Sequence, residues 1–208
     1  VLCWLRGFRA RHAIDDALAG TLGPRWTDSI DRDLAERLPR GPQRWRWVLP
    51  LARRREVEVR RDVPFATLQG GRELCLDLFL PREKPVNAPV LVFVHGGGWA
   101  IGHREHQGQP LLYDLAAQGW VCASVEYRLS PRATFPDHLV DVKRGIAWLR
   151  EHAAEIGADP AFFVVSGISA GGHLAALAAL TPNDPEAQPG FEAADTSLAG
   201  CVPFYGVY

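Results

Sequence analysis

Apolar and polar positions follow two different patterns along this chain of 208 residues. Two segments in its first half alternate residue by residue, which is typical of half-buried strands, and Gly70-Gly71 lies between them as a turn. Farther along, short apolar runs are separated by segments with helical spacing, which predicts a mostly parallel, twisted sheet with helices on both faces. The expected strands are residues 56–63, 74–80, 90–94, 121–125, 162–166 and 200–204, and the expected helices are residues 106–118, 137–152 and 170–180.

The expected helix at residues 137–152 has the clearest amphipathic pattern. Its apolar side chains recur every three or four positions, so they lie along one face and predict packing against the sheet. The apolar face of this helix consists of Leu139, Val142, Ile146, Leu149 and Ala153. A further short helix is expected over residues 28–38.

Composition adds an uneven distribution of charge. With 47% hydrophobic and 23% charged residues, the chain resembles an ordinary globular domain. Residues 1–61 carry 14 basic and 8 acidic side chains, whereas the remainder carries 9 and 16. This shift predicts a basic, tryptophan-rich arm or cap over residues 1–55 and a globular body over residues 56–208.

The basic arm interleaves arginines with Trp4, Trp26, Trp45 and Trp47. The simplest interpretation is a helical arm that packs on the body, and the same composition is compatible with contact to an anionic membrane surface. No zinc-finger, helix-turn-helix or RNA-binding signature accompanies the arginines, so no nucleic-acid partner is expected. Without an apolar run of 18 residues or a signal-peptide core, the sequence predicts a cytoplasmic protein, with membrane association as the open alternative.

A G-x-S-x-G motif follows the expected strand at residues 162–166 and leads directly into an alanine-rich helix. Gly167 and Gly171 lack a Cβ, so the chain can turn sharply and the helix can pack close to the strand, which raises the Ser169 hydroxyl at the tip. The first N–H groups of that helix, beginning with Ala170, suit a developing negative charge. Ser169 is the candidate nucleophile, and an ordinary turn serine is the alternative.

Three successive glycines, Gly96–Gly98, follow the expected strand at residues 90–94. Attack on a carbonyl places negative charge on its oxygen, which requires preorganised N–H donors. The candidate donors are Gly97, Gly98 and Ala170. A flexible loop or a phosphate cradle is the alternative, but no Lys-Ser/Thr pair follows, and Ile101 stands where G-x-G-x-x-G needs its third glycine.

The four cysteines are widely spaced and form no CxxC or metal-binding pattern. They are expected to be small buried side chains rather than disulfide partners or zinc ligands, so no metal site is predicted. The four are Cys3, Cys75, Cys122 and Cys201.

Together, the glycine run and the serine motif resemble the hormone-sensitive-lipase-like branch of the α/β-hydrolases. The segments that carry the resemblance are His95–Trp99 (HGGGW), Tyr127–Pro131 (YRLSP) and Gly167–Gly172 (GISAGG). Further landmarks occur in the expected order at Phe135-Pro136, Asp141 and Asp159-Pro160. The resemblance runs from Pro89 to Leu180 and implies an α/β-hydrolase fold, an N-terminal helical cap over the active site, and the N-terminal part of a catalytic domain over residues 56–208.

The resemblance implies a serine esterase or lipase that forms an acyl-enzyme on small-molecule carboxylic esters, often with short acyl chains. It implies no metal and no organic cofactor. Ile168 stands where the family commonly carries an acidic residue, so the substrate preference of the acidic form does not carry over. Arg128 and Asp141 are expected to form an internal bracing pair. The implied roles are nucleophile for Ser169; oxyanion hole for Gly97, Gly98 and Ala170; and motif support for His95, Gly96, Gly167 and Gly171. Trp99 and Ile168 are the candidate pocket residues, and packing is the simpler interpretation of Trp99.

The resemblance also implies a catalytic triad in the order serine, acid, histidine. Only His173 follows Ser169, four residues along the same helix, so it cannot take the usual loop position. Because the chain reaches Tyr208 at the last expected strand, we expect a fragment of a longer hydrolase whose acid and histidine lie beyond residue 208. The acids that follow Ser169 are expected to be solvated loop charges: Asp184, Glu186, Glu192 and Asp195.

A second class of function stays open. The plant gibberellin receptors, which resemble the same family, bind a ligand on a hydrolase scaffold without a working base. A histidine in a later loop would favour the enzyme, and its absence would favour such a catalytically incomplete ligand-binding protein.

Overall fold

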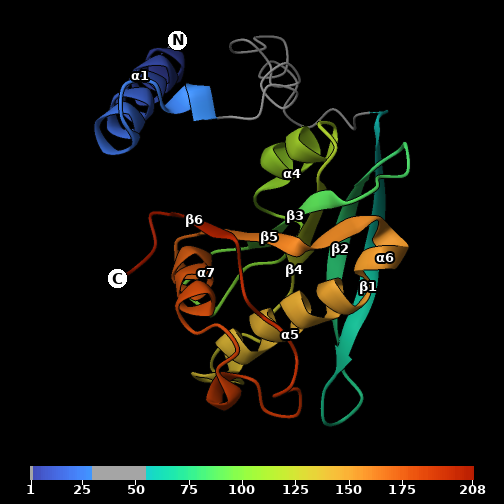
Figure 1. Ribbon diagram of the computed structural model, residues 1–208. Helices are drawn as coiled ribbons and strands as arrows, with labels where there is room; N and C mark the ends of the chain where they lie inside the picture. Colours follow the sequence, from blue (N-terminus) through green and yellow to red (C-terminus); the bar gives the residue numbers. More distant parts are fainter. Residues whose placement is uncertain (1, 30–54) are drawn as a thin grey trace. The chain divides into compact units, whose positions relative to one another are not determined.

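The computed structural model describes residues 2–29 and 55–208 and divides the chain into two compact units, Val1–Leu49 and Pro50–Tyr208 (Figure 1). The first unit contains helix α1 (Leu2–Leu22) and a 3-10 turn (Trp26–Ser29). Most of the helix expected at residues 28–38 lies outside the described residues, as do Trp45 and Trp47. Within the described ranges, no helix is both long and apolar enough to cross a membrane.

A six-stranded sheet forms the centre of the second unit, in the order β1-β2-β4-β3-β5-β6. The two alternating segments pair as the antiparallel hairpin β1-β2, and β2 is antiparallel to β4. The neighbours β4-β3, β3-β5 and β5-β6 are parallel, so the expected mostly parallel sheet is confirmed. The strands are β1 (Val57–Thr67), β2 (Glu73–Pro81), β3 (Ala88–Val94), β4 (Val121–Val125), β5 (Ala158–Ile168) and β6 (Gly200–Phe204).

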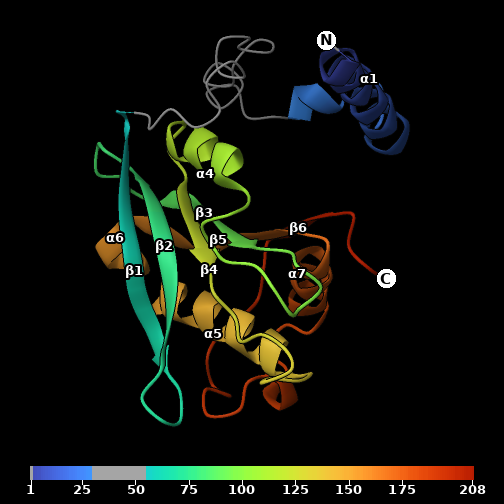
Figure 2. The same ribbon diagram turned by 180° about the vertical axis from the view of Figure 1, so that it is seen from behind.

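Helices cover both faces of the sheet, as expected. Figures 1 and 2 show α4 on one side of it and α5 with α7 on the other. Because each crossover helix connects two parallel strands, the carboxyl ends of those strands gather at one edge. The helices of this unit are α4 (Gln109–Ala116), α5 (Asp137–Glu151), α6 (Ala153–Ile156) and α7 (Ala170–Leu180), with a 3-10 turn at Pro185–Ala187.

The apolar patterns of the sequence become two buried clusters, one on each face of the sheet. The predicted apolar face is buried along its whole length against the larger cluster, which also contains Val92, Phe163 and Leu174. Its first four residues lie in α5, whereas Ala153 begins α6. On the other face, Leu112 and Ala116 of α4 pack with Phe79 and Phe93. This packing fixes the strands whose ends carry the candidate site.

Two strands, β1 and β5, extend four residues beyond an expected limit, whereas β2 and β3 do so by one or two residues. The prediction ended the first strand before Pro64, but β1 continues to Thr67, because an edge strand tolerates proline and its register shifts on either side of that residue. The prediction began the fifth strand at Phe162, whereas β5 begins at Ala158, which pairs with Ala88 of β3. Both errors come from turn residues that the sheet accommodates.

Candidate active site

Ser169 is the single residue between the end of β5 and the start of α7. Its backbone has φ 56° and ψ −120°, a conformation that costs a non-glycine residue about 1–3 kcal/mol. The Ser169 N–H donates to the Phe204 carbonyl of β6, and the Ser169 carbonyl accepts from the His173 N–H, each at 3.0 Å. The strained turn is therefore held by β6 on one side and by α7 on the other.

Glycines on both sides of Ser169 allow this turn. A Cβ on Gly167 would lie 2.3 Å from the Gly171 carbonyl oxygen. A Cβ on Gly171 would lie 2.2 Å from the Val94 carbonyl oxygen and 2.4 Å from that of His95. Real Cβ atoms do not approach backbone this closely, so α7 can pack against the end of β3 only because these positions are glycine.

The glycine run lies directly against the Ser169 turn. A Cβ on Gly96 would lie 2.6 Å from the Ile168 carbonyl oxygen and 3.2 Å from Ser169 Cβ. Gly97 and Gly98 have φ of 131° and 58°. Among the residues of the described body, the N–H groups of Gly97, Gly98 and Ala170 donate to no protein acceptor. The fold thus brings Ser169 beside a glycine run in which the N–H groups of Gly97 and Gly98 are free within the described body.

The His95 side chain contacts the glycine run and is buried, with 1% exposure. Its ring stacks on Tyr127 with 4.4 Å between centroids, and its Nδ1 lies 2.9 Å from the Gly96 carbonyl oxygen. Burial lowers the pKa of His95 below the usual value for histidine, so the ring is neutral near pH 7. Within the described residues, the His95 ring is thus engaged with Gly96 and Tyr127 and forms no hydrogen bond with Ser169.

Gln107 was not singled out by sequence analysis, although its side chain reaches the glycine run. The Gly96 N–H donates to Gln107 Oε1 at 2.7 Å. Gln107 stands in a polar loop between β3 and α4, where nothing in the local pattern separates it from solvated neighbours. Only the folded path of the loop shows which of these side chains turns inward.

A buried ionic network around Arg104 was also missed. Its Nε donates to Asp77 at 2.9 Å, and its Nη1 lies 3.3 Å from a Glu126 carboxylate oxygen; Asp62 is a further partner. Burial would lower the pKa of Arg104, but the hydrogen bond and charge of Asp77 outweigh it and raise that pKa. Asp77 interrupts an apolar strand run, which was the signal available in the sequence, and it is fully buried.

Trp99 and Ile168, the predicted pocket residues, pack against different clusters. Trp99 is half-buried against the α5 and α7 cluster, and its ring meets the His173 ring edge-on at 5.3 Å. Ile168 packs against the α4 cluster. His173 Nδ1 is buried and has no hydrogen-bond partner in the described part of the chain. His173 therefore contacts the glycine loop through Trp99 and forms no hydrogen bond with the Ser169 hydroxyl.

Arg128 and Asp141 form the bracing pair that was expected. Arg128 Nε and Nη2 donate to the two Asp141 carboxylate oxygens at 2.8 Å, and the Arg128 backbone N–H donates at 2.9 Å. Hydrogen bonding and the charge of Asp141 raise the pKa of Arg128. This pair ties the loop after β4 to α5.

The acids that follow Ser169 have local partners in the loop between α7 and β6. Asp184 accepts from the Glu186 N–H at 3.0 Å, Glu192 accepts from the Gly190 N–H at 2.8 Å, and Asp195 pairs with Arg150. The hydrogen bond from Gly190 lowers the pKa of Glu192. None of these carboxylates hydrogen-bonds to His173 or Ser169 within the described residues.

Cys122 is buried, and Cys75 and Cys201 are half-buried free thiols. Burial raises the pKa of Cys122, which leaves the thiol protonated and unreactive. Within the described residues, no group of three or more histidine, cysteine or acidic side chains could hold a metal ion.

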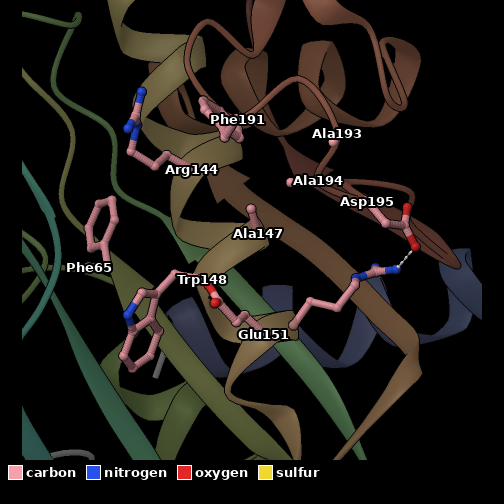
Figure 3. A pocket seen from close by; sticks show the side chains of 10 residues that line it. Phe65, Arg144, Ala147, Trp148, Glu151, Phe191, Ala193, Ala194 and Asp195 are labelled. Atoms are coloured by element: carbon pink, nitrogen blue, oxygen red, sulfur yellow. Dashed lines mark hydrogen bonds and ion pairs between the residues drawn. The ribbon is translucent and has the colours of Figure 1, made fainter.

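A cavity of about 530 Å³ lies along α5 and is shown in Figure 3. Arg144 lies over the Phe191 ring on one side, Trp148 and Phe65 form another side, and Arg150 pairs with Asp195. None of its ten lining residues belongs to the glycine run or to the Ser169 turn. The cavity is therefore separate from the candidate active site.

A family model described as BD-FAE matches residues 76–208 of this chain. Among curated proteins, esterase LipQ of Mycobacterium tuberculosis is 43% identical over 205 residues, which cover 96% of this chain and 48% of LipQ. The probable carboxylic ester hydrolase LipM of the same organism is 56% identical over 140 residues, which cover 66% of this chain and 32% of LipM. The chain thus spans about half or less of the length of these relatives.

Solved structures similar to this chain include esterase 2 of Thermogutta terrifontis. Its butyrate-bound form has a TM-score of 0.64 and 30% identity, covering 74% of this chain and 54% of that chain. A form phosphorylated by paraoxon has a TM-score of 0.64 and 29% identity, covering 74% of this chain and 58% of that chain. The sheet and helices described above therefore have a counterpart in an esterase of known structure.

Proposed function

The chain belongs to the BD-FAE family and has the α/β-hydrolase fold, and from this premise we propose that the full-length protein hydrolyses carboxylic esters with Ser169 as nucleophile. The observation that carries the proposal is the strained position of Ser169 beside Gly96. A serine held in this conformation at a strand-to-helix turn presents its hydroxyl above the sheet, where a carbonyl carbon can approach it.

The glycine run and the start of α7 supply the electrostatic part of the mechanism. When the Ser169 Oγ attacks the ester carbonyl, negative charge forms on the carbonyl oxygen. The N–H groups of Gly97, Gly98 and Ala170 are unoccupied in the described body, and we assign them to this oxyanion. Each such donor is typically worth about 3–4 kcal/mol of transition-state stabilisation. Collapse of the intermediate expels the alcohol and leaves an acyl-serine, which water hydrolyses to the acid.

The proton of Ser169 must pass to a general base during the attack. His95 is engaged with Gly96 and Tyr127, and His173 packs against Trp99. We therefore propose that the base is a histidine of the full-length protein outside residues 1–208, oriented by an acid that also lies outside them. The coverage of LipQ and LipM is consistent with this arrangement.

Short-chain acyl esters are the proposed substrates. The support is the related esterase of T. terrifontis, whose structures carry bound butyrate and bound propionate. The half-buried Trp99, which follows the glycine run, is the residue of this chain that we place at the border of the acyl site.

Ser169→Ala in the full-length protein tests the proposal. We expect turnover of a nitrophenyl butyrate to fall by about four orders of magnitude or more, because the covalent step is removed. Ser197→Ala, in the loop before β6, is the matched control and should keep parental turnover. Unchanged hydrolysis by Ser169→Ala would overturn the proposal, and stable ligand binding without turnover by the parent protein would favour a ligand-binding protein.

A further inference from the structure

Two side chains from separate segments hold the peptide bond that leads into the glycine run. The Tyr127 hydroxyl donates to the His95 carbonyl oxygen at 3.0 Å, and the Gly96 N–H donates to Gln107 Oε1 at 2.7 Å. Burial raises the pKa of Tyr127, so its hydroxyl stays protonated and remains a donor. The plane of the His95-Gly96 peptide cannot rotate without breaking one of these hydrogen bonds.

Gln107 determines which N–H groups of the run remain free. In the described part of the chain, it is the one side chain that accepts from a backbone N–H of Gly96–Gly98. Because the Gly96 N–H is occupied, Gly97 and Gly98 are the donors of the run that stay available to an oxyanion. Gln107 thus separates the structural donor of the run, Gly96, from the two donors of the run that are assigned to catalysis, Gly97 and Gly98.

The position of Gln107 is itself fixed from both sides. Three residues before it, Arg104 is held by the buried Asp77 and by Glu126. Directly after it, Gly108 has φ 73°, and a Cβ there would lie 2.5 Å from the Phe93 ring of β3. The Arg104 carbonyl also accepts from the Ser124 hydroxyl of β4 at 2.8 Å. A side chain between two such anchors can impose its orientation on the glycine run.

Gln107 is also close to the reacting serine. A Cβ built on Gly96 would lie 3.3 Å from Gln107 Oε1 and 3.2 Å from Ser169 Cβ, so these two atoms are at most 6.5 Å (3.3 + 3.2) apart. A charge placed on the Gln107 side chain would therefore act on the negative charge that develops beside Ser169.

We propose that Gln107 is a positioning residue of the oxyanion hole. Its side-chain carbonyl fixes the His95-Gly96 peptide and thereby aims the N–H groups of Gly97 and Gly98 at the carbonyl oxygen of a bound ester. This role rests on the proposed ester hydrolysis, because it acts through donors that matter only when an oxyanion forms.

Gln107→Leu removes the acceptor and leaves the Gly96 N–H without a partner. We expect kcat for a nitrophenyl butyrate to fall by about 10- to 100-fold with little change in KM, since misplaced donors are felt in the transition state. Gln118→Leu is the matched control, because Gln118 also loses a side-chain hydrogen bond, to Asp114, at the far end of α4. Equal kcat in Gln107→Leu and the parent protein would overturn the proposal.

Gln107→Glu keeps an acceptor for the Gly96 N–H and adds negative charge. Its kcat relative to the parent protein should be reduced at pH 8 and should rise as the pH falls and the carboxyl group becomes protonated. A ratio that does not change with pH would show that a charge on this side chain is not felt at the oxyanion, and it would contradict the placement of Gln107 beside the oxyanion hole.

Amide hydrogen exchange of Gly96 separates this proposal from the proposed function. The Gly96 N–H should exchange slowly in the parent protein and in Gln107→Glu, and at least about tenfold faster in Gln107→Leu. An unchanged exchange rate of the Gly96 N–H in Gln107→Leu would overturn the positioning role of Gln107, even if Ser169 is required for turnover. If Ser169→Ala retained activity, the esterase mechanism would fail, while the exchange rates would still decide whether Gln107 holds Gly96.

Discussion

The Ser169 turn and the cavity along α5 differ in how their polar groups are used. At the turn, Ser169 has a strained backbone, and the N–H groups of Gly97 and Gly98 are unoccupied within the described body. At the cavity, Arg144 donates to the Pro189 carbonyl and Arg150 donates to the Ser197 carbonyl. The cavity is a defined hollow, but its arginines are engaged in holding the loop before β6. Free donors and backbone strain, rather than a hollow, distinguish the region that we propose to be reactive.

Gly97→Ala should have the largest effect at the proposed reactive region. A Cβ at φ 131° is strained, and it would lie 1.9 Å from the Ile101 carbonyl oxygen, so the loop must shift. We expect kcat to fall by about 100- to 1000-fold, as for loss of an oxyanion donor. The measurement is steady-state hydrolysis of a nitrophenyl butyrate by the full-length protein.

Gly70→Ala is the control for backbone strain alone. Gly70 also has a positive φ of 89°, but its Cβ position has open space around it. We expect a cost of about 1 kcal/mol in unfolding free energy and unchanged kcat. Similar losses of kcat in the two variants would contradict the special role of Gly97.

Asp77→Ala tests the ionic network that anchors the loop after β3. Asp77 is fully buried and accepts from Arg61 at 2.7 Å and from Arg104 at 2.9 Å. Its removal leaves the Arg104 charge buried with fewer partners, and we expect the unfolding free energy to fall by about 3–5 kcal/mol. Urea denaturation checks this value.

Glu58→Ala removes an exposed ion pair from β1, the strand that pairs with the strand of Asp77. Glu58 and Arg60 are about half exposed, so their 2.7 Å pair should contribute less than about 1 kcal/mol. Equal losses in Asp77→Ala and Glu58→Ala would contradict the proposed importance of burial in the network.

The sequence predicted the contiguous features of this molecule and missed those that depend on contacts between distant segments. Strand and helix order followed from apolar periodicity, and Ser169 and the glycine run were recognisable because each motif is contiguous. Gln107 and Arg104 were not recognisable in the sequence, because a loop residue gains its partner only when the chain folds back across the sheet. The burial of Asp77 was marked by a charge inside an apolar strand, but its partners were not.

Acidification should weaken the fold through His95. Burial lowers the folded-state pKa of His95 below its unfolded value of about 6.5, so below pH 6.5 the unfolded chain binds a proton that the folded chain resists. Stability should therefore decrease as the pH falls from about 6.5 toward the folded pKa. Urea denaturation at pH 7.5 and pH 5 should show a steeper loss in the parent protein than in His95→Gln, and parallel losses would contradict this assignment.

Phe191→Ala should have little effect on catalysis. It removes the ring under Arg144 at the cavity and should cost about 0.5–1 kcal/mol in unfolding free energy. Turnover of the nitrophenyl butyrate should stay within about twofold of the parent value, because the cavity shares no residue with the Ser169 region. A large fall in kcat without a loss of stability would show that the two regions are coupled.

The most direct test of the central claim is peptide mapping of the full-length protein after reaction with a fluorophosphonate. An activated serine forms a stable phosphonyl ester, which adds its mass to one peptide. We expect a single adduct on Ser169 and none in Ser169→Ala. An adduct on another residue, or no adduct in a protein that hydrolyses esters, would contradict the assignment of Ser169 as the nucleophile.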